Sequence, residues 1–222
     1  MGANHAQPRN HCIRCGQCCL KSSPTLHRED ASLLVNGPLR KEHLLTIRQG
    51  EGITDNIEEV LRPAGREMIK LKEKNGVGGG CIFFQDQDKA CAIYDWRPLQ
   101  CRAFNCWDTG EFMEVYERPR LVRQEIVEDK TLQGLIREHE RRCAYALVED
   151  LVKQIPSRGE EALNALLDLL KFDYELRPFV SQKLNINPAE MDFYFGRPLI
   201  QTIAMFGLRV IREADGGFLL TS

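Results

Sequence analysis

Eight cysteines in two groups are the residues of this sequence whose type and spacing could do chemistry. In the first group, two-residue spacers separate the first three cysteines. A tight turn can then bring their sulfurs together while backbone N–H groups hydrogen-bond to them. In the second group, ten-residue steps separate the first three members. Thiolates clustered in this way bind zinc or iron, the latter also as an iron–sulfur cluster. We name the groups the first cluster, Cys12, Cys15, Cys18 and Cys19, and the second cluster, Cys81, Cys91, Cys101 and Cys106.

The spacing favours more than one metal centre. Cys18 and Cys19 are adjacent and would chelate one tetrahedral ion awkwardly. We therefore expect them to bind different metals, or one of them to bridge two metals or to contact a metal ligand without binding the metal itself. In a hairpin that pairs Cys81 near Tyr94 and Cys91 near Phe84, the Cα atoms of these two cysteines lie roughly 10 Å apart, because a strand rises ~3.3 Å per residue. Sulfurs lie only about 2.3 Å from zinc, so one ion would hardly hold both.

Other polar residues have two readings each. Cys143 lies on the apolar stripe of a predicted helix, where a thiol packs as a small hydrophobe. His139 lies on the same face and could join Cys143 in reaching the metal, although a buried, hydrogen-bonded histidine is the favoured interpretation. Arg97 and Arg102 lie between cysteines of the second cluster. Their charge would offset thiolate charge there, or they would form a turn contact and a surface ion pair.

The cysteines and their neighbours resemble the CxxCxxCC zinc- or iron-chelating proteins of the YkgJ type. The resemblance covers roughly residues 10–107, and seven cysteines match its motif, with Cys106 matching less clearly. It implies a bacterial, cytoplasmic protein with cysteine-bound zinc or iron. The cysteine-rich part of flagellin lysine methylases looks similar, which implies methyl transfer as an alternative. The matching pieces are Cys12-x2-Cys15-Gly16-x-Cys18-Cys19, Cys81-Ile82-Phe83-Phe84, and Cys91-x-Ile93-Tyr94-x2-Arg97-Pro98-x2-Cys101-Arg102-x-Phe104.

The composition excludes several classes of partner. The 222 residues hold 30 Lys and Arg against 32 Asp and Glu, a formal net charge of −2, so we expect no nucleic acid partner, which needs a basic face. The most apolar stretch, residues 199–211, is shorter than the ~20 residues of a membrane span and carries Arg209, so we expect no membrane. The N-terminus is polar and shows no export signal. These features predict a cytoplasmic protein, in which clustered cysteines bind metal rather than form disulfides.

The elements that must position the cysteines belong to an α+β fold, mainly α. We expect a small irregular cysteine-rich metal-binding domain with a short β-hairpin over residues 1–118, followed by a helical bundle over residues 119–222. In the first domain, short helices over residues 30–49 break at residues 36–38, and a glycine-rich loop over residues 76–80 leads to the hairpin.

The second domain should consist of helices whose apolar residues recur at three- and four-residue intervals. One long helix is expected from near residue 128 to near Pro156, and a capping box of Ser157 and Glu160 starts the next. Asn187 with Pro188 starts another helix, and a last one runs from about residue 198 to residue 214. Core packing accounts for these helices, and none of them demands a ligand.

Three functions remain open at this level. The first is a metal-binding protein in which zinc or an iron–sulfur cluster is at least partly structural, because closed cysteine sites contribute folding energy. The second is an iron–sulfur redox enzyme or an accessory to a protein-modifying enzyme such as a methyltransferase, although the sequence holds no other catalytic motif. The third is a metal carrier or sensor in which Cys18 and Cys19 exchange ligands with partners. A metal ion is the one partner that the sequence predicts.

Overall fold

The computed structural model of the chain describes residues 10–54, 60–74, 79–213 and 216–221. The chain forms two compact units. Unit 1 comprises Met1–Arg40 and Lys70–Leu121, and unit 2 comprises Lys41–Ile69 and Val122–Ser222. The segment from Lys41 to Ile69 therefore clusters with the C-terminal part of the chain. Separate domains over residues 1–118 and 119–222 stay a prediction.

Unit 1 is built from short elements. Apart from α4, its helices have five residues or fewer, and its hairpin strands have two residues each. Of the short helices expected over residues 30–49, those before residues 36–38 are confirmed, whereas residues 44–47 form a strand instead. The helical elements are α1 (Gln17–Lys21), η1 (Arg28–Ala31), α2 (Ser32–Val35), η3 (Tyr94–Trp96), α3 (Leu99–Ala103) and α4 (Gly110–Tyr116), with η denoting 3-10 helices.

The predicted hairpin of the second cluster is present but shorter than expected. Strands β5 (Phe84–Gln85) and β6 (Ala90–Cys91) pair antiparallel, with Phe84 opposite Cys91 as expected. The expected pairing of Cys81 near Tyr94 is wrong. Cys81 instead forms an isolated β-bridge with Glu73. The N–H of Cys81 bonds to the carbonyl of Cys19, and the N–H of Ile82 bonds to the carbonyl of Lys72, so neither group is available to a strand that contains Tyr94. The expected loop over residues 76–80 lies mostly outside the described residues.

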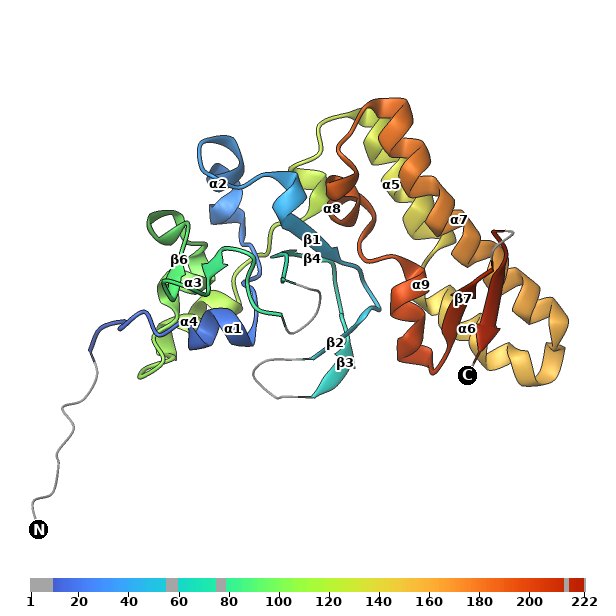
Figure 1. The fold of residues 1–222 in the computed structure, drawn as a ribbon, viewed down its shortest axis with the longest axis horizontal. Helices are drawn as coiled ribbons and strands as arrows, with labels where there is room; N and C mark the ends of the chain where they lie inside the picture. Colours follow the sequence, from blue (N-terminus) through green and yellow to red (C-terminus); the bar gives the residue numbers. More distant parts are fainter. Residues whose placement is uncertain (1–9, 55–59, 75–78, 214–215, 222) are drawn as a thin grey trace, which may run out of the picture. The chain divides into compact units, whose positions relative to one another are not determined.

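Unit 2 contains most of the helical residues, so the predicted α+β fold with a helical C-terminal region is confirmed (Figure 1). Strand β1 (Leu44–Ile47) pairs with β4 (Met68–Leu71), whose first two residues belong to unit 2, and β2 (Gly52–Thr54) pairs with β3 (Leu61–Pro63). The helical elements are η2 (Lys41–His43), η4 (Arg123–Glu125), α5 (Lys130–Arg142), α6 (Tyr145–Arg158), α7 (Glu160–Leu184), η5 (Pro188–Glu190), α8 (Met191–Phe195), α9 (Leu199–Thr202) and η6 (Ile203–Phe206).

The apolar core of unit 2 lies between α6, α7 and α9. Apolar residues of the C-terminal hairpin, formed by β7 (Arg209–Arg212) and β8 (Phe218–Thr221), pack against it. α6 and α7 lie side by side in Figure 1. The buried members of the core are Cys143, Tyr145, Val148, Leu166, Leu169, Leu170, Leu199 and Ile203.

The single long helix expected up to Pro156 is wrong. The helix breaks between Cys143 and Tyr145, where Ala144 has an extended backbone, so that α5 and α6 are separate. The break directs both Cys143 and Tyr145 into the core, and Arg48 Nη2 donates to the carbonyl of Cys143 at 2.7 Å. A tertiary hydrogen bond thus satisfies a carbonyl that a continuous helix would use itself.

Two other helix ends also differ from the predictions. Ser157 lies inside α6 and caps nothing; α7 begins after Gly159, whose φ is +53°. The expected last helix stops at Gly207, which has φ +77°, and residues 209–212 form β7 instead. The helix start at Asn187 and Pro188 is confirmed as η5, in which the Asn187 side chain accepts from the N–H of Ala189 at 3.0 Å.

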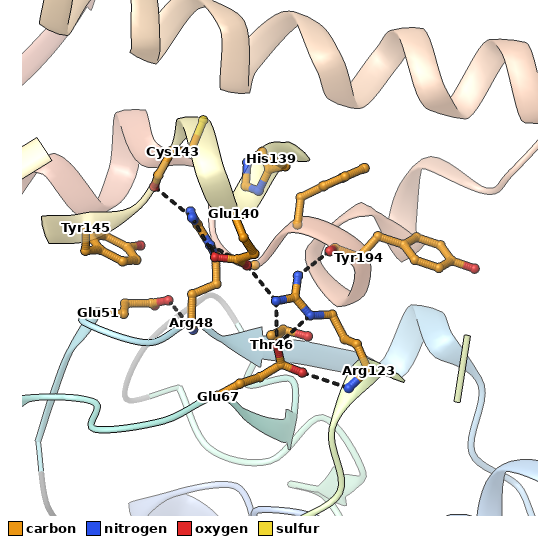
Figure 2. Close-up of polar contacts among 12 residues, drawn as sticks. Thr46, Arg48, Glu51, Glu67, Arg123, His139, Glu140, Cys143, Tyr145 and Tyr194 are labelled. Atoms are coloured by element: carbon orange, nitrogen blue, oxygen red, sulfur yellow. Dashed lines mark hydrogen bonds and ion pairs between the residues drawn. The ribbon is translucent and has the colours of Figure 1, made fainter. Parts of the chain in front are cut away.

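Buried ion pairs connect the strand segment of unit 2 to its helices. Figure 2 shows Glu140 of α5 between the guanidinium groups of Arg48 and Arg123. Its carboxylate accepts from Arg48 Nε at 2.9 Å and from Arg123 Nη2 at 2.6 Å. Arg123 also pairs with Glu67 at 2.6 Å. Because the side chain of Arg48 is 0% exposed and that of Arg123 is 3% exposed, both charges depend on these carboxylates.

Candidate metal centre

The first cluster is shaped by a glycine turn at the start of α1. Gly16 precedes the helix with φ +77°, a conformation that favours glycine. A Cβ at this position would lie 2.3 Å from Cζ of Phe84, so the turn also packs directly against the hairpin. The first turn of α1 then presents Cys18 and Cys19, whose Sγ atoms are 3.9 Å apart.

A backbone hydrogen bond joins the two clusters. The N–H of Cys81 donates to the carbonyl of Cys19 at 2.7 Å. Gly80 allows this approach, because a Cβ there would lie 3.0 Å from the same carbonyl oxygen, and its φ of +78° is again one that glycine adopts readily. The end of α1 and the start of the second cluster therefore lie side by side.

Five of the eight predicted ligands lie near enough to one another in unit 1 to shift one another's pKa values, although no three of their sulfurs lie within 4.8 Å of one another in the described part of the chain. Each thiol in this group interacts electrostatically with at least three of the others. The cysteines come from α1, from the hairpin and the residues before it, and from α3. We name them the five-thiol set: Cys18, Cys19, Cys81, Cys91 and Cys101.

The two adjacent thiols of the five-thiol set differ in acidity. The hydrogen bond between Cys18 and Cys19 is the largest cause: it lowers the pKa of Cys18 to about 6 and raises the pKa of Cys19. Cys18 is therefore the thiol of this pair that is ready to bind a cation as thiolate near neutral pH. Cys19 stays protonated, and its S–H group donates a hydrogen bond to the sulfur of Cys18.

The other three thiols of the set are protonated in the absence of a cation. Burial raises the pKa of Cys81 to about 11, and burial is also the largest cause that raises the pKa values of Cys91 and Cys101. The guanidinium of Arg97 acts in the opposite direction on Cys18, Cys91 and Cys101. This direction is the one expected if Arg97 offsets thiolate charge, one of its two predicted roles, which stays a prediction. Its Nε donates to the carbonyl of Tyr94 at 2.8 Å, which holds the guanidinium in place.

The remaining three predicted ligands lie at the surface of unit 1. Cys12, Cys15 and Cys106 are exposed. Cys12 Sγ accepts from the N–H of Arg14 at 3.4 Å, the kind of turn contact that its spacing predicts. The guanidinium of Arg14 lies 4.0 Å from the ring centroid of Tyr94, and that of Arg97 lies 3.6 Å from the same ring. Tyr94, whose importance the sequence analysis missed, therefore connects the loop of the first cluster to that of the second.

The distance between Cys18 and Cys19 bears on the number of metal centres. Two sulfurs at about 2.3 Å from a tetrahedral zinc ion lie about 3.8 Å apart. The observed 3.9 Å is therefore compatible with both thiolates on one ion. Separate centres for these two residues stay a prediction.

A second group of potential ligands lies in unit 2. Ligand atoms of His139, Cys143 and Asp173 all lie within 4.8 Å of one another, and no other trio among the described residues meets this criterion. Both oxygens of Asp173 are already used, by His139 Nε2 at 2.7 Å, by Arg177 Nη2 at 3.0 Å and by the N–H of Leu199 at 2.8 Å.

This group has the character of a structural network. Burial lowers the pKa of His139 and keeps the ring neutral, while Cys143 is 0% exposed within the core of unit 2. The favoured interpretations of His139 as a buried, hydrogen-bonded histidine and of Cys143 as a core thiol are confirmed. Asp173 was not among the predicted site residues, although it continues the apolar stripe of Leu166 and Leu170, and a charge on such a stripe signals a buried partner.

The comparison with protein families agrees with the motif. Residues 11–118 match the CxxCxxCC family, described as a putative zinc- or iron-chelating domain. We refer to residues 11–118 as the CxxCxxCC domain. This confirms the resemblance and supports a metal ion as the partner of the domain. All eight predicted ligands and the residues that position them in unit 1 lie within these bounds.

A protein similar to part of this chain occurs in an archaeon. The uncharacterized protein MJ0661 of Methanocaldococcus jannaschii is 34% identical over 92 residues, which are 41% of this chain and 42% of that protein. The match thus spans less than half of the relative's length. No solved structure matches the chain significantly. Among the described residues, no helix combines the length and hydropathy of a membrane span.

Proposed function

We propose that the CxxCxxCC domain binds zinc or iron through the five-thiol set, with Cys12, Cys15 and Cys106 completing the coordination. The observation that carries this proposal is that five thiols from three segments of unit 1 influence one another's pKa values, with the Sγ atoms of Cys18 and Cys19 3.9 Å apart and the N–H of Cys81 bonded to the carbonyl of Cys19. A cation removes the repulsion that these thiolates would otherwise exert on one another, because each bound thiolate contributes negative charge. An all-thiolate set suits both zinc and an iron–sulfur cluster.

The metal is at least partly structural in this proposal. The helices of unit 1 have at most seven residues, and its hairpin strands have two residues each. Helices shorter than about 12 residues and isolated two-stranded hairpins are marginal in water. Since metal binding to thiolates contributes directly to folding free energy, a bound ion supplies the stability that these elements lack. A reducing compartment such as the cytoplasm would keep the thiols available.

Metal analysis of anaerobically purified protein tests the proposal. Stoichiometric zinc in a colourless protein supports a zinc site, and iron with acid-labile sulfide in a brown protein supports a cluster. The variant Cys101→Ser should lose metal, whereas the matched variant Cys143→Ser, which alters a buried thiol of unit 2, should keep it. Protein that retains no metal after reconstitution with zinc, and with iron and sulfide, would overturn the proposal.

Single replacements at the adjacent cysteines test the number of centres. If Cys18 and Cys19 serve different centres, Cys18→Ser and Cys19→Ser remove different fractions of the bound metal. If both contact one ion, as their 3.9 Å separation allows, either replacement removes the same metal and leaves the same remainder. Equal and complete loss from both variants would contradict a multi-centre site.

A metal carrier is the second candidate, and the exposure of Cys12 and Cys15 favours it. Exposed thiolates can be attacked by an incoming ligand, so a carrier should release metal to a partner or chelator quickly. Stopped-flow transfer of zinc to a chromogenic chelator distinguishes the two functions. Replacement of Cys12 or Cys15 by Ser should slow transfer if these thiols hand over the ion. Transfer that takes hours in all variants supports the structural role instead.

A further inference from the structure

A buried polar clamp holds the helix that carries Cys101. Asp30 accepts from the N–H of Leu99 through Oδ1 at 2.8 Å and from the N–H of His27 through Oδ2 at 2.9 Å. Gln100 Oε1 accepts from the N–H of Thr25 at 2.8 Å. The Nε2 atom of Gln100 lies 3.1 Å from Nε2 of His27. These contacts join the first turn of α3 to residues 25–30, and we name them the α3 clamp.

The α3 clamp is closed to solvent. His27 and Asp30 are 0% exposed, and Gln100 is 7% exposed. A polar group left unsatisfied at such a depth costs about 1–3 kcal/mol, so each member depends on its partner. Both oxygens of the Asp30 carboxylate are engaged, which fixes the direction of the N–H of Leu99.

The contacts also determine where protons lie. Gln100 Oε1 must be the acceptor from the N–H of Thr25, so the other end of the amide is the Nε2 donor. His27 Nε2 is then the acceptor from Gln100, and the proton of the neutral ring lies on Nδ1. Burial lowers the pKa of His27, which keeps the ring neutral. The contact with Gln100 thus requires an unprotonated His27 Nε2, while His27 Nδ1 is buried with no hydrogen-bond partner among the described residues.

α3 needs an external anchor because it has only five residues. Its first N–H groups have no partner within the helix, and Asp30 supplies one for Leu99. At the other end, Phe104 contacts Phe112 edge to face, with ring centroids 5.3 Å apart. Cys101 follows directly on the two residues that the clamp holds. A shift of this first turn therefore moves the Cys101 sulfur relative to the other thiols.

We propose that Asp30 and Gln100 are positioning residues of the metal centre, which hold α3 so that Cys101 faces the rest of the five-thiol set. The inference rests on the proposed function. It adds to the proposed metal site two residues that do not bind the metal themselves but position the ligand Cys101. Polar partners behind metal ligands orient those ligands, and their loss costs typically 10–100-fold in metal affinity.

Three variants test the α3 clamp. Gln100→Ala removes both contacts of the amide, and Gln100→Glu keeps them if the His27 proton moves to Nε2. Gln133→Ala is the matched control, because its amide also bonds to a backbone group, the carbonyl of Val127 at 2.6 Å, but lies in unit 2. We expect Gln100→Ala to bind Zn²⁺ and Co²⁺ about 10–100-fold more weakly. Gln100→Glu should recover most of this loss, and Gln133→Ala should equal wild type.

The spectrum of the cobalt-saturated protein separates positioning from general destabilisation. If Cys101 leaves the coordination sphere in Gln100→Ala, the thiolate-to-cobalt charge-transfer band loses the intensity of one thiolate even at saturation. A variant that is only less stable would show the wild-type spectrum once saturated. Wild-type affinity together with a wild-type saturated spectrum in Gln100→Ala would overturn the inference.

A metal-free measurement keeps this result distinct from the proposed function. In metal-free protein, Gln100→Ala should be alkylated faster at Cys101, measured by peptide mass spectrometry, with no change at Cys143. If wild type binds no metal, the proposed function fails, and faster alkylation at Cys101 still supports the positioning of its thiol by Gln100. Equal alkylation rates in Gln100→Ala and wild type would contradict that positioning.

Discussion

Replacement of Glu140 by Gln should destabilise unit 2 by about 2–3 kcal/mol, somewhat less than the cost of breaking a fully buried ion pair. Glu140 bonds to Arg48 through both oxygens, at 2.9 Å and 3.0 Å, and to Arg123 at 2.6 Å. The two arginines are not equally dependent on it. After the replacement, Arg123 still has its ion pair with Glu67. Arg48 still donates to the carbonyl of Cys143, but it loses the one carboxylate that its guanidinium contacts among the interactions described above. The cost is therefore mainly that of leaving Arg48 charged and buried.

The magnitude follows from the acidity of Glu140 in the folded protein. Burial alone would raise its pKa, but the charges and hydrogen bonds of Arg48 and Arg123 outweigh burial and lower the pKa to about 2, from 4.5. One pKa unit corresponds to about 1.4 kcal/mol, so this shift corresponds to about 3 kcal/mol. The side chain of Glu140 is 32% exposed, so solvent screening reduces this figure. Removing one partner of a fully buried pair costs about 3–5 kcal/mol, which sets the upper bound.

The assay can observe the two units separately. Both tryptophans, Trp96 and Trp107, belong to unit 1, so their fluorescence reports its unfolding. Far-UV circular dichroism reports mainly α5, α6 and α7 of unit 2. Urea titrations at pH 7 should show a lower midpoint by circular dichroism for Glu140→Gln. The control is Glu138→Gln on the same helix, whose exposed partner is Arg141. Equal midpoints for the two variants would refute the reasoning.

The effect of Glu140 should depend on pH in a defined direction. Its pKa is lower in the folded protein, so its stabilising contribution is complete above the unfolded value near 4.5 and is lost as the pH falls toward 2. The difference in unfolding free energy between wild type and Glu140→Gln should therefore be largest at pH 7 and narrow below pH 4.5. A difference that stays constant down to pH 3 would mean that the carboxylate charge is not its source.

Three further predictions concern unit 1. Gly16→Ala should destabilise unit 1 by more than Gly207→Ala destabilises unit 2. Both glycines have φ +77°, but only at Gly16 would the added Cβ clash with a neighbour, the ring of Phe84. Equal changes in the two urea midpoints would contradict this prediction. Removal of metal by a thiol chelator should speed proteolysis within residues 70–121 while the helical signal of unit 2 persists, and an unchanged cleavage rate would contradict a structural metal. Zinc affinity should fall as the pH is lowered from 8 to 6, because burial raises the pKa of Cys81 to about 11 and such thiols must lose their protons to bind zinc. A zinc affinity that does not change over this pH range would contradict the prediction.

The ligand residues could be predicted from the sequence because their spacing is local. Two-residue spacers and Gly16 predict a turn, and the structure has that turn, with φ +77° at Gly16. The register of Phe84 with Cys91 was also predictable, since two apolar runs flank one polar stretch. Which thiols come together was not predictable. That grouping depends on the bond between Cys81 and Cys19 and on the clamp between Asp30 and α3, and both join segments more than 60 residues apart.

The errors in the second unit share a physical cause. Apolar periodicity identified the positions that face the core but not where the helix axis changes. At Cys143 the break depends on Arg48, 95 residues away in the sequence, which satisfies the freed carbonyl. At Gly207 the pattern of Ile203 and Val210 fits a helix, but Val210 pairs with Leu220 in a hairpin. Glycine pairs such as Gly216 and Gly217 can end a helix, but they serve hairpin turns as well.

The two units obtain their stability from different sources, and this difference is itself an argument for a metal in the first. Unit 2 combines three helices of 13 to 25 residues with an apolar core and with buried carboxylates that are hydrogen-bonded, such as Asp173. Unit 1 buries polar groups of similar cost, among them Asp30 and Gln100, behind a helix of five residues. Such an arrangement contributes to a unique structure more than to stability. The thiols that it orients would then supply the missing free energy when they bind an ion, so the clamp and the metal depend on each other.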